Sequence, residues 1–239
     1  AIFDNFLRPY ASEYDFPSVY VDDQKDPQIA LLHNHVMQII SGNPNANEFP
    51  ELLNLLPNVA VIQHPKDDLW NEKIIDHFKE KVNWQHRTKF SSEDLDLNHI
   101  RSLKENIPQG YSVVKLTEEI IRKFNPHLVQ QYEMFYGSID NFIAKGFGFC
   151  ALSESGELAS LCTCANPMFN NEFEIDIVTD QNHRRKGLAT ITAAYLIEYS
   201  LLNGLVPHWD AANEISTNLA LKLGYTKPEY YQAPLIINE

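Results

Sequence analysis

The spacing of apolar residues predicts alternating helices and strands in the first half of the chain. An Asp-Pro pair followed by apolar residues at helical spacing predicts a helix over residues 27–40. The same spacing predicts helices over 67–82 and 97–107, whereas the short segments 59–62 and 84–90 are expected to be strands. None of these segments carries a recognisable chemical motif, so the pattern gives this half a shape without a function.

Strands precede helices in the second half. The predicted elements, in order, are a strand at 111–116, helices through about residue 143, strands at 146–152, 157–165 and 173–179, a helix at 187–203, a strand at 206–210, a helix at 214–223 and a strand from 225. The predicted fold class is therefore α/β, with a mixed and largely antiparallel sheet flanked by helices in the second half and a smaller α/β domain before it.

Glycine usage predicts a boundary between the two halves. Gly42 is the only glycine before Gly110, and Pro108 and Gly110 form a turn signal at the point where the composition changes. We expect an N-terminal domain over 1–107 and a C-terminal domain over 108–239.

Composition and charge narrow the classes of partner. The chain of 239 residues is 44% hydrophobic, which is enough for a packed core, and it has no apolar run long enough to span a membrane. A net charge of −13, spread over both halves, excludes duplex nucleic acid and anionic membrane surfaces as partners. Solubility is the ordinary explanation of such acidity, and the alternative is a preference for a cationic ligand.

The cysteine pattern predicts a cytoplasmic protein. Cys150, Cys162 and Cys164 form neither a CxxC motif nor an even-numbered framework, which is typical of a reducing compartment. Residues 1–20 lack the apolar core of a signal peptide. Because Cys162 and Cys164 share one strand face, we expect them in the core, and no other cluster of histidine and cysteine predicts a metal site.

The loop at 181–190 has the features of an anion site. Arg184, Arg185 and Lys186 are consecutive in an otherwise acidic region, and Gly187 follows them at the start of a helix. The first amides of a helix have no intrahelical partner and lie at the positive end of its dipole, where they bind phosphate groups. A solvated basic turn is the alternative, but three cations there oppose the dipole unless an anion binds.

Two segments resemble the GNAT superfamily of N-acetyltransferases. Residues 184–189 match its acyl-CoA loop, which has Gln or Arg, two residues, Gly, one residue, and Gly or Ala. Residues 213–225 resemble a second family segment with Asn213, Ser216, Leu219 and a Gly-Tyr pair at its end. The resemblance covers 108–239, and residues 207–213 are similar to a bacterial branch that carries an extra N-terminal domain.

The resemblance implies that acetyl-CoA is the cofactor. The backbone of the strand at 177–179 would pair with the pantetheine arm, the loop amides would hold the pyrophosphate, and two residues of the later segment would meet the arm near the sulfur. The residues implied to bind CoA are Ile177, Val178, Thr179, Arg184, Arg185, Lys186, Gly187, Leu188, Ala189, Thr190, Asn213 and Ser216.

Acyl transfer to an amine also needs a base, because a free alkyl ammonium has a pKa near 10.4. Glu172, Glu174 and Asp176 share one face of the predicted strand at 173–179. Such a face could attract a cationic amine and hold the base, or it could simply face solvent. We expect Glu174 to be the base, with Asp176 and Glu172 as rivals.

The expected acid departs from the family pattern. Many members have a tyrosine four residues before the glycine that ends the last helix, and this chain has Ala220 there. The leaving thiolate would then be protonated by another group, such as Tyr225 or water, or would need no assigned side chain.

The predicted function is an acyl-CoA-dependent N-acetyltransferase that moves an acetyl group directly to the amine of a small molecule. Two alternatives stay open: a noncatalytic acyl-CoA-binding module, and an acetyltransferase that acts on a protein amine. The sequence does not identify the acceptor, and it leaves open whether the protein is a homodimer.

Overall fold

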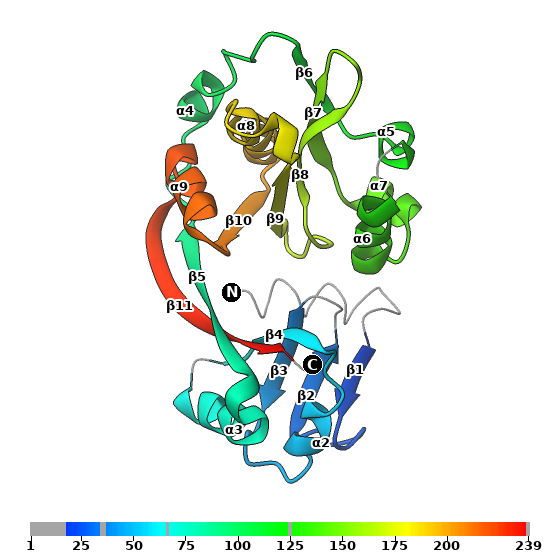
Figure 1. Ribbon diagram of the computed structural model, residues 1–239, viewed down its shortest axis with the longest axis vertical. Coiled ribbons are helices and arrows are strands. Elements are labelled where there is room, and N and C mark those ends of the chain that lie inside the picture. Colours follow the sequence, from blue (N-terminus) through cyan, green and yellow to red (C-terminus); the bar gives the residue numbers. More distant parts are fainter. Residues whose placement is uncertain (1–17, 34–36, 66, 124–125, 238–239) are drawn as a thin grey trace. The chain divides into compact units, whose positions relative to one another are not determined.

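The computed structural model describes residues 18–33, 37–65, 67–123 and 126–237. The chain forms two compact units, one of residues 1–87 and 230–239 and one of residues 88–229 (Figure 1). Strands β5 (Val82–Ser91) and β11 (Thr226–Ile237) each contribute residues to both units.

The strands confirm the predicted fold class. Among the described residues, hydrogen bonds join them in the order β1-β2-β3-β4-β11-β5-β10-β9-β8-β7-β6. Most neighbouring pairs are antiparallel, whereas β3 with β4 and β9 with β10 are parallel. The sheet is therefore mixed and largely antiparallel, with helices against it.

In the described residues of the first unit, helices α2 and α3 pack against a sheet. Its remaining elements are β1 (Ser18–Val21), β2 (Ile29–His33), β3 (Met37–Gly42), α2 (Phe49–Leu53), β4 (Val59–Gln63), α3 (Asp68–Phe78) and a 3-10 turn η1 (Lys79–Lys81). Trp70 and Ile74 of α3 are buried against Ile40 of β3 and Ile62 of β4. Asp67 caps α3 through the amide of Leu69, which agrees with the predicted start of this helix near residue 67.

The predicted helix over 27–40 is wrong, because the described residues of this range form β2 and β3, which pair as antiparallel strands. Leu31 and Leu32 of β2 are both buried although they point to opposite faces of the strand. A strand buried on both faces loses its alternation and cannot be distinguished from a buried helix by spacing alone. The Asp22 carboxylate also binds the amides of Gln28 and Ile29, at 2.9 and 3.1 Å, which fixes the start of β2 in an extended form.

Two other helices are shorter than their apolar spacing predicts. α3 ends at Phe78 because Lys79 adopts a positive φ of 53°, and Val82 then begins β5 instead of completing the helix. The helix predicted over 97–107 is α4 (Leu97–Ser102).

The second unit follows the predicted order of elements closely. It contains β6 (Tyr111–Lys115), α5 (Glu118–Arg122), α6 (Pro126–Tyr136), α7 (Ile139–Lys145), β7 (Gly148–Ser153), β8 (Leu158–Cys164), β9 (Glu172–Thr179), a 3-10 turn η2 (Gln181–His183), α8 (Leu188–Leu202), β10 (Val206–Ala211) and α9 (Glu214–Leu223). No helix in the described residues is both long and apolar enough to cross a membrane.

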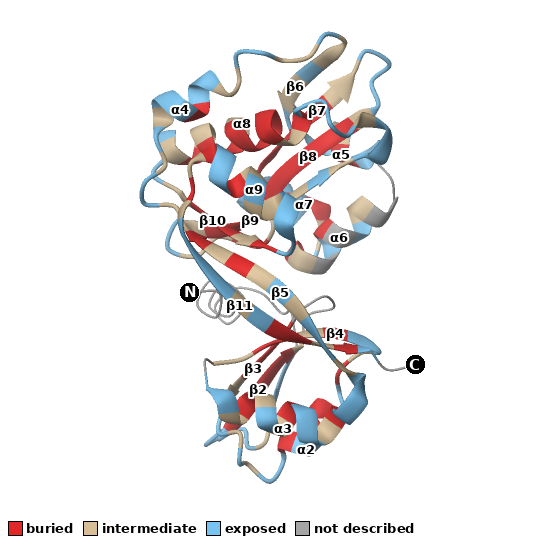
Figure 2. Ribbon diagram, turned by 60° about the vertical axis from the view of Figure 1, so that its left-hand side comes forward, coloured by how far each residue is buried: buried red, intermediate tan, exposed pale blue. Residues whose placement is uncertain are grey.

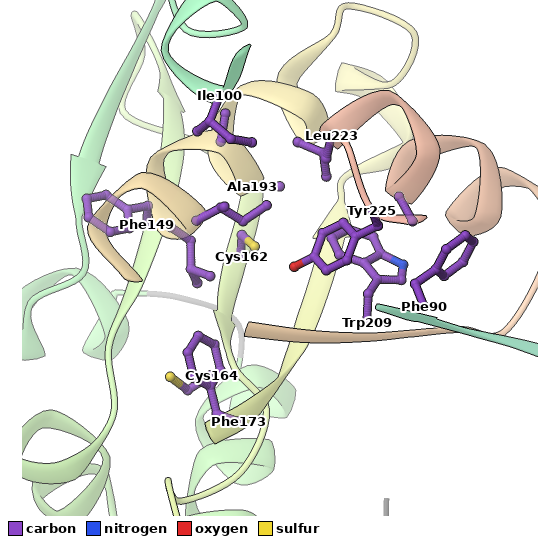
Figure 3. Packing of buried hydrophobic residues seen from close by; sticks show 14 of the residues in the cluster. Phe90, Ile100, Phe149, Cys162, Cys164, Phe173, Ala193, Trp209, Leu223 and Tyr225 are labelled. Carbon is purple, nitrogen blue, oxygen red and sulfur yellow. The ribbon is translucent and has the colours of Figure 1, made fainter. Parts of the chain in front are cut away.

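Helices cover both faces of the part of the sheet that lies in the second unit. α8 packs on one face and α5, α6 and α7 lie on the other (Figure 1), and Figure 2 shows α8 and β8 buried over most of their lengths. The core beside α8 contains Trp209 and Tyr225, together with Phe90 of β5 and Ile100 of α4 (Figure 3). Because those last two residues precede residue 108, the compact units do not divide at the boundary expected from glycine usage.

Candidate active site

The parallel strands β9 and β10 separate halfway along β9. β9 pairs with β10 only through Glu172, Phe173 and Glu174, whereas its pairing with β8 continues to Thr179. From Ile175 onward, its backbone therefore has no strand partner on the β10 side among the described residues. An open strand edge of this kind can pair with an extended ligand. The predicted residues Ile177, Val178 and Thr179 lie on this edge, and Val178 is 43% exposed.

The predicted anion loop joins β9 to α8. Gly187 forms the N-cap of α8 in a left-handed conformation, with φ of 80°, and Arg185 also has a positive φ of 62°. The basic side chains of the loop are exposed. The side chains of Leu188 and Thr190 are buried, so only the backbone amides of these two residues could bind a ligand at the loop. The amides of the first turn of α8 have no carbonyl partner within the helix, so they remain available to an anion.

Two contacts hold this loop in place. Arg184 Nε donates to the carbonyl of Thr179 at 3.2 Å, which connects the loop to the end of β9. Lys186 Nζ donates to the hydroxyl of Tyr111 at 2.6 Å, and the same hydroxyl lies 2.8 Å from His183 Nδ1. Sequence reasoning missed the role of Tyr111, because this residue lies 75 positions before Lys186 in the chain and matches no motif.

Asn213 and Ser216 lie where β10 leads into α9. Asn213 Oδ1 accepts a hydrogen bond from the Ser216 amide at 3.0 Å and caps α9. Ser216 Oγ accepts a hydrogen bond from Trp209 Nε1, also at 3.0 Å. Beyond His208, β10 pairs with β5 and no longer with β9, so β9 and β10 diverge after Glu174 and His208. We call this divergence the fork. Its two arms are the open edge of β9 and the end of β10, which leads to Asn213 and Ser216.

The three predicted carboxylates share one face of β9. Glu174 is only 7% exposed, which contradicts a solvated polar face at this position. Its amide donates to Asn166 Oδ1 at 3.1 Å, and its carbonyl accepts from the Ala165 amide at 2.8 Å, so its backbone is fixed at the fork. Glu172 and Asp176 are less buried than Glu174.

Two residues of β10 belong to this acidic face but were not predicted. His208 is the register partner of Glu174, and its Nε2 lies 3.0 Å from Glu172 Oε2. Asp210 lies two residues farther along the same face. In the sequence, Pro207 and Trp209 alternate with the polar residues His208 and Asp210. This alternation could have predicted that His208 and Asp210 share one face of the strand, and the structure shows them half-buried there.

Tyr132 of α6 was also missed by sequence reasoning. Its side chain is buried and forms a hydrogen bond with Thr163 of β8. It also interacts electrostatically with the Asp176 carboxylate. Burial raises the pKa of Tyr132 well above its usual range, and the Thr163 bond only partly offsets this. The hydroxyl therefore keeps its proton at neutral pH.

The structure gives no support to Tyr225 as the acid. Tyr225 is 2% exposed in the core beside Trp209, and its hydroxyl donates to the Pro207 carbonyl at 3.1 Å (Figure 3). Burial raises the pKa of Tyr225 far above its usual range. Ala220 is fully buried in the same core and offers no proton donor.

The cysteines lie in the core, as expected. Cys150, Cys162 and Cys164 are free and buried, and burial raises the pKa of Cys150 to about 12. Burial also raises the pKa of the other two thiols well above the usual range. Thiolates are the reactive form of cysteine, so an acyl-cysteine has no chemical support here. No group of three potential metal ligands occurs among the described residues.

Comparison with known proteins identifies a consistent set of relatives. A family model described as GNAT acetyltransferase matches residues 10–233, so the similarity is not confined to 108–239. The chain is 28% identical over 223 residues to an uncharacterized N-acetyltransferase of Bacillus subtilis strain 168, YdfB, covering 89% of this chain and 83% of that protein.

Solved structures agree with this result. A GCN5-related N-acetyltransferase-like protein from Streptococcus suis is 25% identical with a TM-score of 0.74, covering 91% of this chain and 87% of that one. A GCN5-related N-acetyltransferase from Kribbella flavida, 13% identical with a TM-score of 0.56, covers 89% of this chain and 87% of that one and shows the same fold.

Proposed function

We propose that this chain, which belongs to the GNAT acetyltransferase family and is an N-acetyltransferase, uses acetyl-CoA. It would move the acetyl group directly from the thioester to the amine of a small molecule. The observation that carries the proposal is the fork between β9 and β10, with an anion loop at its open end and a buried carboxylate at its closed end. The noncatalytic alternative is set aside because the family is one of enzymes.

The residues of the fork fit CoA. The open backbone edge over 177–179 would pair with the amides of the pantetheine arm, and the amides of 185–190 with the three basic side chains would hold the pyrophosphate. Asn213 and Ser216 would contact the arm from the β10 side. Bound there, acetyl-CoA supplies an acetyl group activated as a thioester.

The acidic face would receive the acceptor. Its carboxylates attract an ammonium group, and Glu174 takes a proton from it so that the neutral amine can attack. Glu172 and Asp176 contribute charge on either side of Glu174. A general base of this kind contributes roughly 10²–10⁴-fold in rate.

The proposal is tested by release of the CoA thiol during incubation of acetyl-CoA with small amines and with lysine peptides. The native cysteines are buried and should not add to the thiol signal. Glu174→Gln should lower kcat by about 100-fold or more while calorimetry shows unchanged acetyl-CoA affinity. Glu154→Gln, in the exposed turn before β8, is the matched control and should keep full activity.

Three results would contradict the proposal or a part of it. Wild-type protein that releases no CoA with any amine would remove the activity, and full turnover by Glu174→Gln would remove this base. Turnover of peptides alone would assign the enzyme to protein amines.

A further inference from the structure

A buried base at the fork requires a route for protons to reach solvent. An ammonium acceptor loses two protons when it becomes an amide, and the leaving thiolate takes up one of them. The second proton must leave the site in every turnover. Glu174, at 7% exposure, has little direct access to water.

His208 stands next to Glu174 in the sheet. The two residues are the last register partners of β9 and β10, and neighbouring strands lie about 4.8 Å apart. Glu174 and Glu172 alternate onto the same face of β9, and His208 Nε2 lies 3.0 Å from Glu172 Oε2. The imidazole therefore contacts the Glu172 carboxylate, and it extends from the residue directly across the sheet from the buried Glu174.

Solvent exposure increases along these three residues. Glu174 is 7% exposed, whereas the side chains of His208 and Glu172 are 22% and 41% exposed. With Nε2–H donated to Glu172, the Nδ1 atom of a neutral imidazole is free to accept a proton. Imidazole also gains and loses protons near neutral pH more readily than any other side chain.

We propose that His208, oriented by Glu172, carries the excess proton from Glu174 to solvent. In each cycle Glu174 passes its proton to Nδ1, directly or through one water, and Nε2 then releases its own proton to solvent, directly or through Glu172. Before the next turnover Nδ1 gives its proton to water and Nε2 takes one up, so that the ring returns to its Nε2–H form and one proton has left the site. His208 acts through Glu174 and is a positioning and relay residue, not the base itself. The inference rests on the proposed function, since it needs an ammonium acceptor.

Other charged groups share this part of the sheet. The charged groups on the face around His208 are Glu172, Glu174 and Asp176 of β9, Asp210 of β10, and Lys89 of β5, which is the register partner of Asp210. A pH profile therefore reports the whole cluster. Buffer dependence distinguishes the relay more sharply.

The test compares two substitutions at His208. Glutamine at this position can still donate an amide hydrogen to Glu172, but it cannot carry a proton. His208→Gln should lower kcat by roughly 10- to 100-fold. The KM values, the affinity for acetyl-CoA and the Tm should stay close to those of the wild type. In His208→Ala, added imidazole or a higher buffer concentration should restore a large part of kcat.

Two further variants sharpen the test. Glu172→Gln should give a smaller loss, and its combination with His208→Gln should be no worse than His208→Gln alone, because both act in one route. His86→Gln is the matched control, since His86 is an exposed histidine on β5 beside the Gln232 amide.

Wild-type kcat in His208→Gln would overturn the relay alone, and so would a loss of kcat that responds to neither imidazole nor buffer. A wild-type protein without turnover on any amine would overturn the relay together with the proposed function.

Discussion

At the scale of single residues, Asn213 combines a structural contact with a predicted ligand contact. Its Oδ1 caps α9 through the Ser216 amide, and its Nδ2 amide group is a separate hydrogen-bond donor. The sequence motif predicted a CoA contact, whereas the structure shows the helix cap. Both uses are compatible, because they involve different atoms of one side chain.

Substitution of Asn213 separates its two uses. Asn213→Asp keeps an N-cap acceptor, so stability should be nearly unchanged, while loss of the amide donor should weaken acetyl-CoA binding by about 3- to 10-fold. Asn213→Ala should also lose about 1 kcal/mol of unfolding free energy. Calorimetry and denaturant unfolding measure both quantities.

The control for this prediction is the cap of α4. Asp96 accepts from the His99 amide at 2.7 Å, so Asp96→Ala should cost similar stability without changing acetyl-CoA affinity. Equal affinity in Asn213→Asp and the wild type would exclude a ligand contact through Nδ2.

At the scale of elements, the proposed anion site depends on the backbone conformation at the start of α8. Gly187 and Gly204, at the two ends of this helix, have positive φ angles of 80° and 66°, and a Cβ atom at either would meet nothing within 4 Å. Steric fit therefore does not require glycine at either site, whereas the left-handed backbone favours it. Only Gly187 adjoins the free amides.

The two glycines provide a matched comparison. Gly187→Ala and Gly204→Ala should each lower stability by about 1 kcal/mol, because alanine is strained in the left-handed region. Only Gly187→Ala should also weaken acetyl-CoA binding, since its methyl group enters the space before the loop amides. Equal affinities in the two variants would argue against an anion site at this end of α8.

At the scale of the whole molecule, the second unit includes residues that precede the boundary expected at 108. β5 pairs with β10 through Phe90 and Trp209, and Phe90 and Ile100 are buried in the core of the second unit. Burial of each such side chain contributes about 1.5–3 kcal/mol. Residues before 108 are thus part of the fold that holds the fork.

A fragment of residues 108–239 tests this dependence. We expect it to lack a cooperative thermal transition and to bind acetyl-CoA at least tenfold more weakly than the full chain, because it lacks β5 and α4. Circular dichroism melting and calorimetry would measure these properties. A soluble fragment with a sharp transition and full affinity would support an independent domain starting at 108.

The sequence by itself determined the features that depend on neighbours in the chain. The order of elements in the second unit and the loop before α8 follow from spacings of a few residues. Local patterns specify such features because the contacts that make them lie within one or two turns of the backbone.

Only the tertiary structure decided the features that depend on distant partners. The paired strands β2 and β3 stand where the spacing predicts a helix, because strands buried on both faces lose their alternation. The burial of Glu174 likewise depends on elements packed around β9. His208 and Glu172 are 36 residues apart in the chain and meet only because β9 and β10 pair before they separate. Periodicity along a chain shows which residues share a face, but strand pairing determines what that face meets.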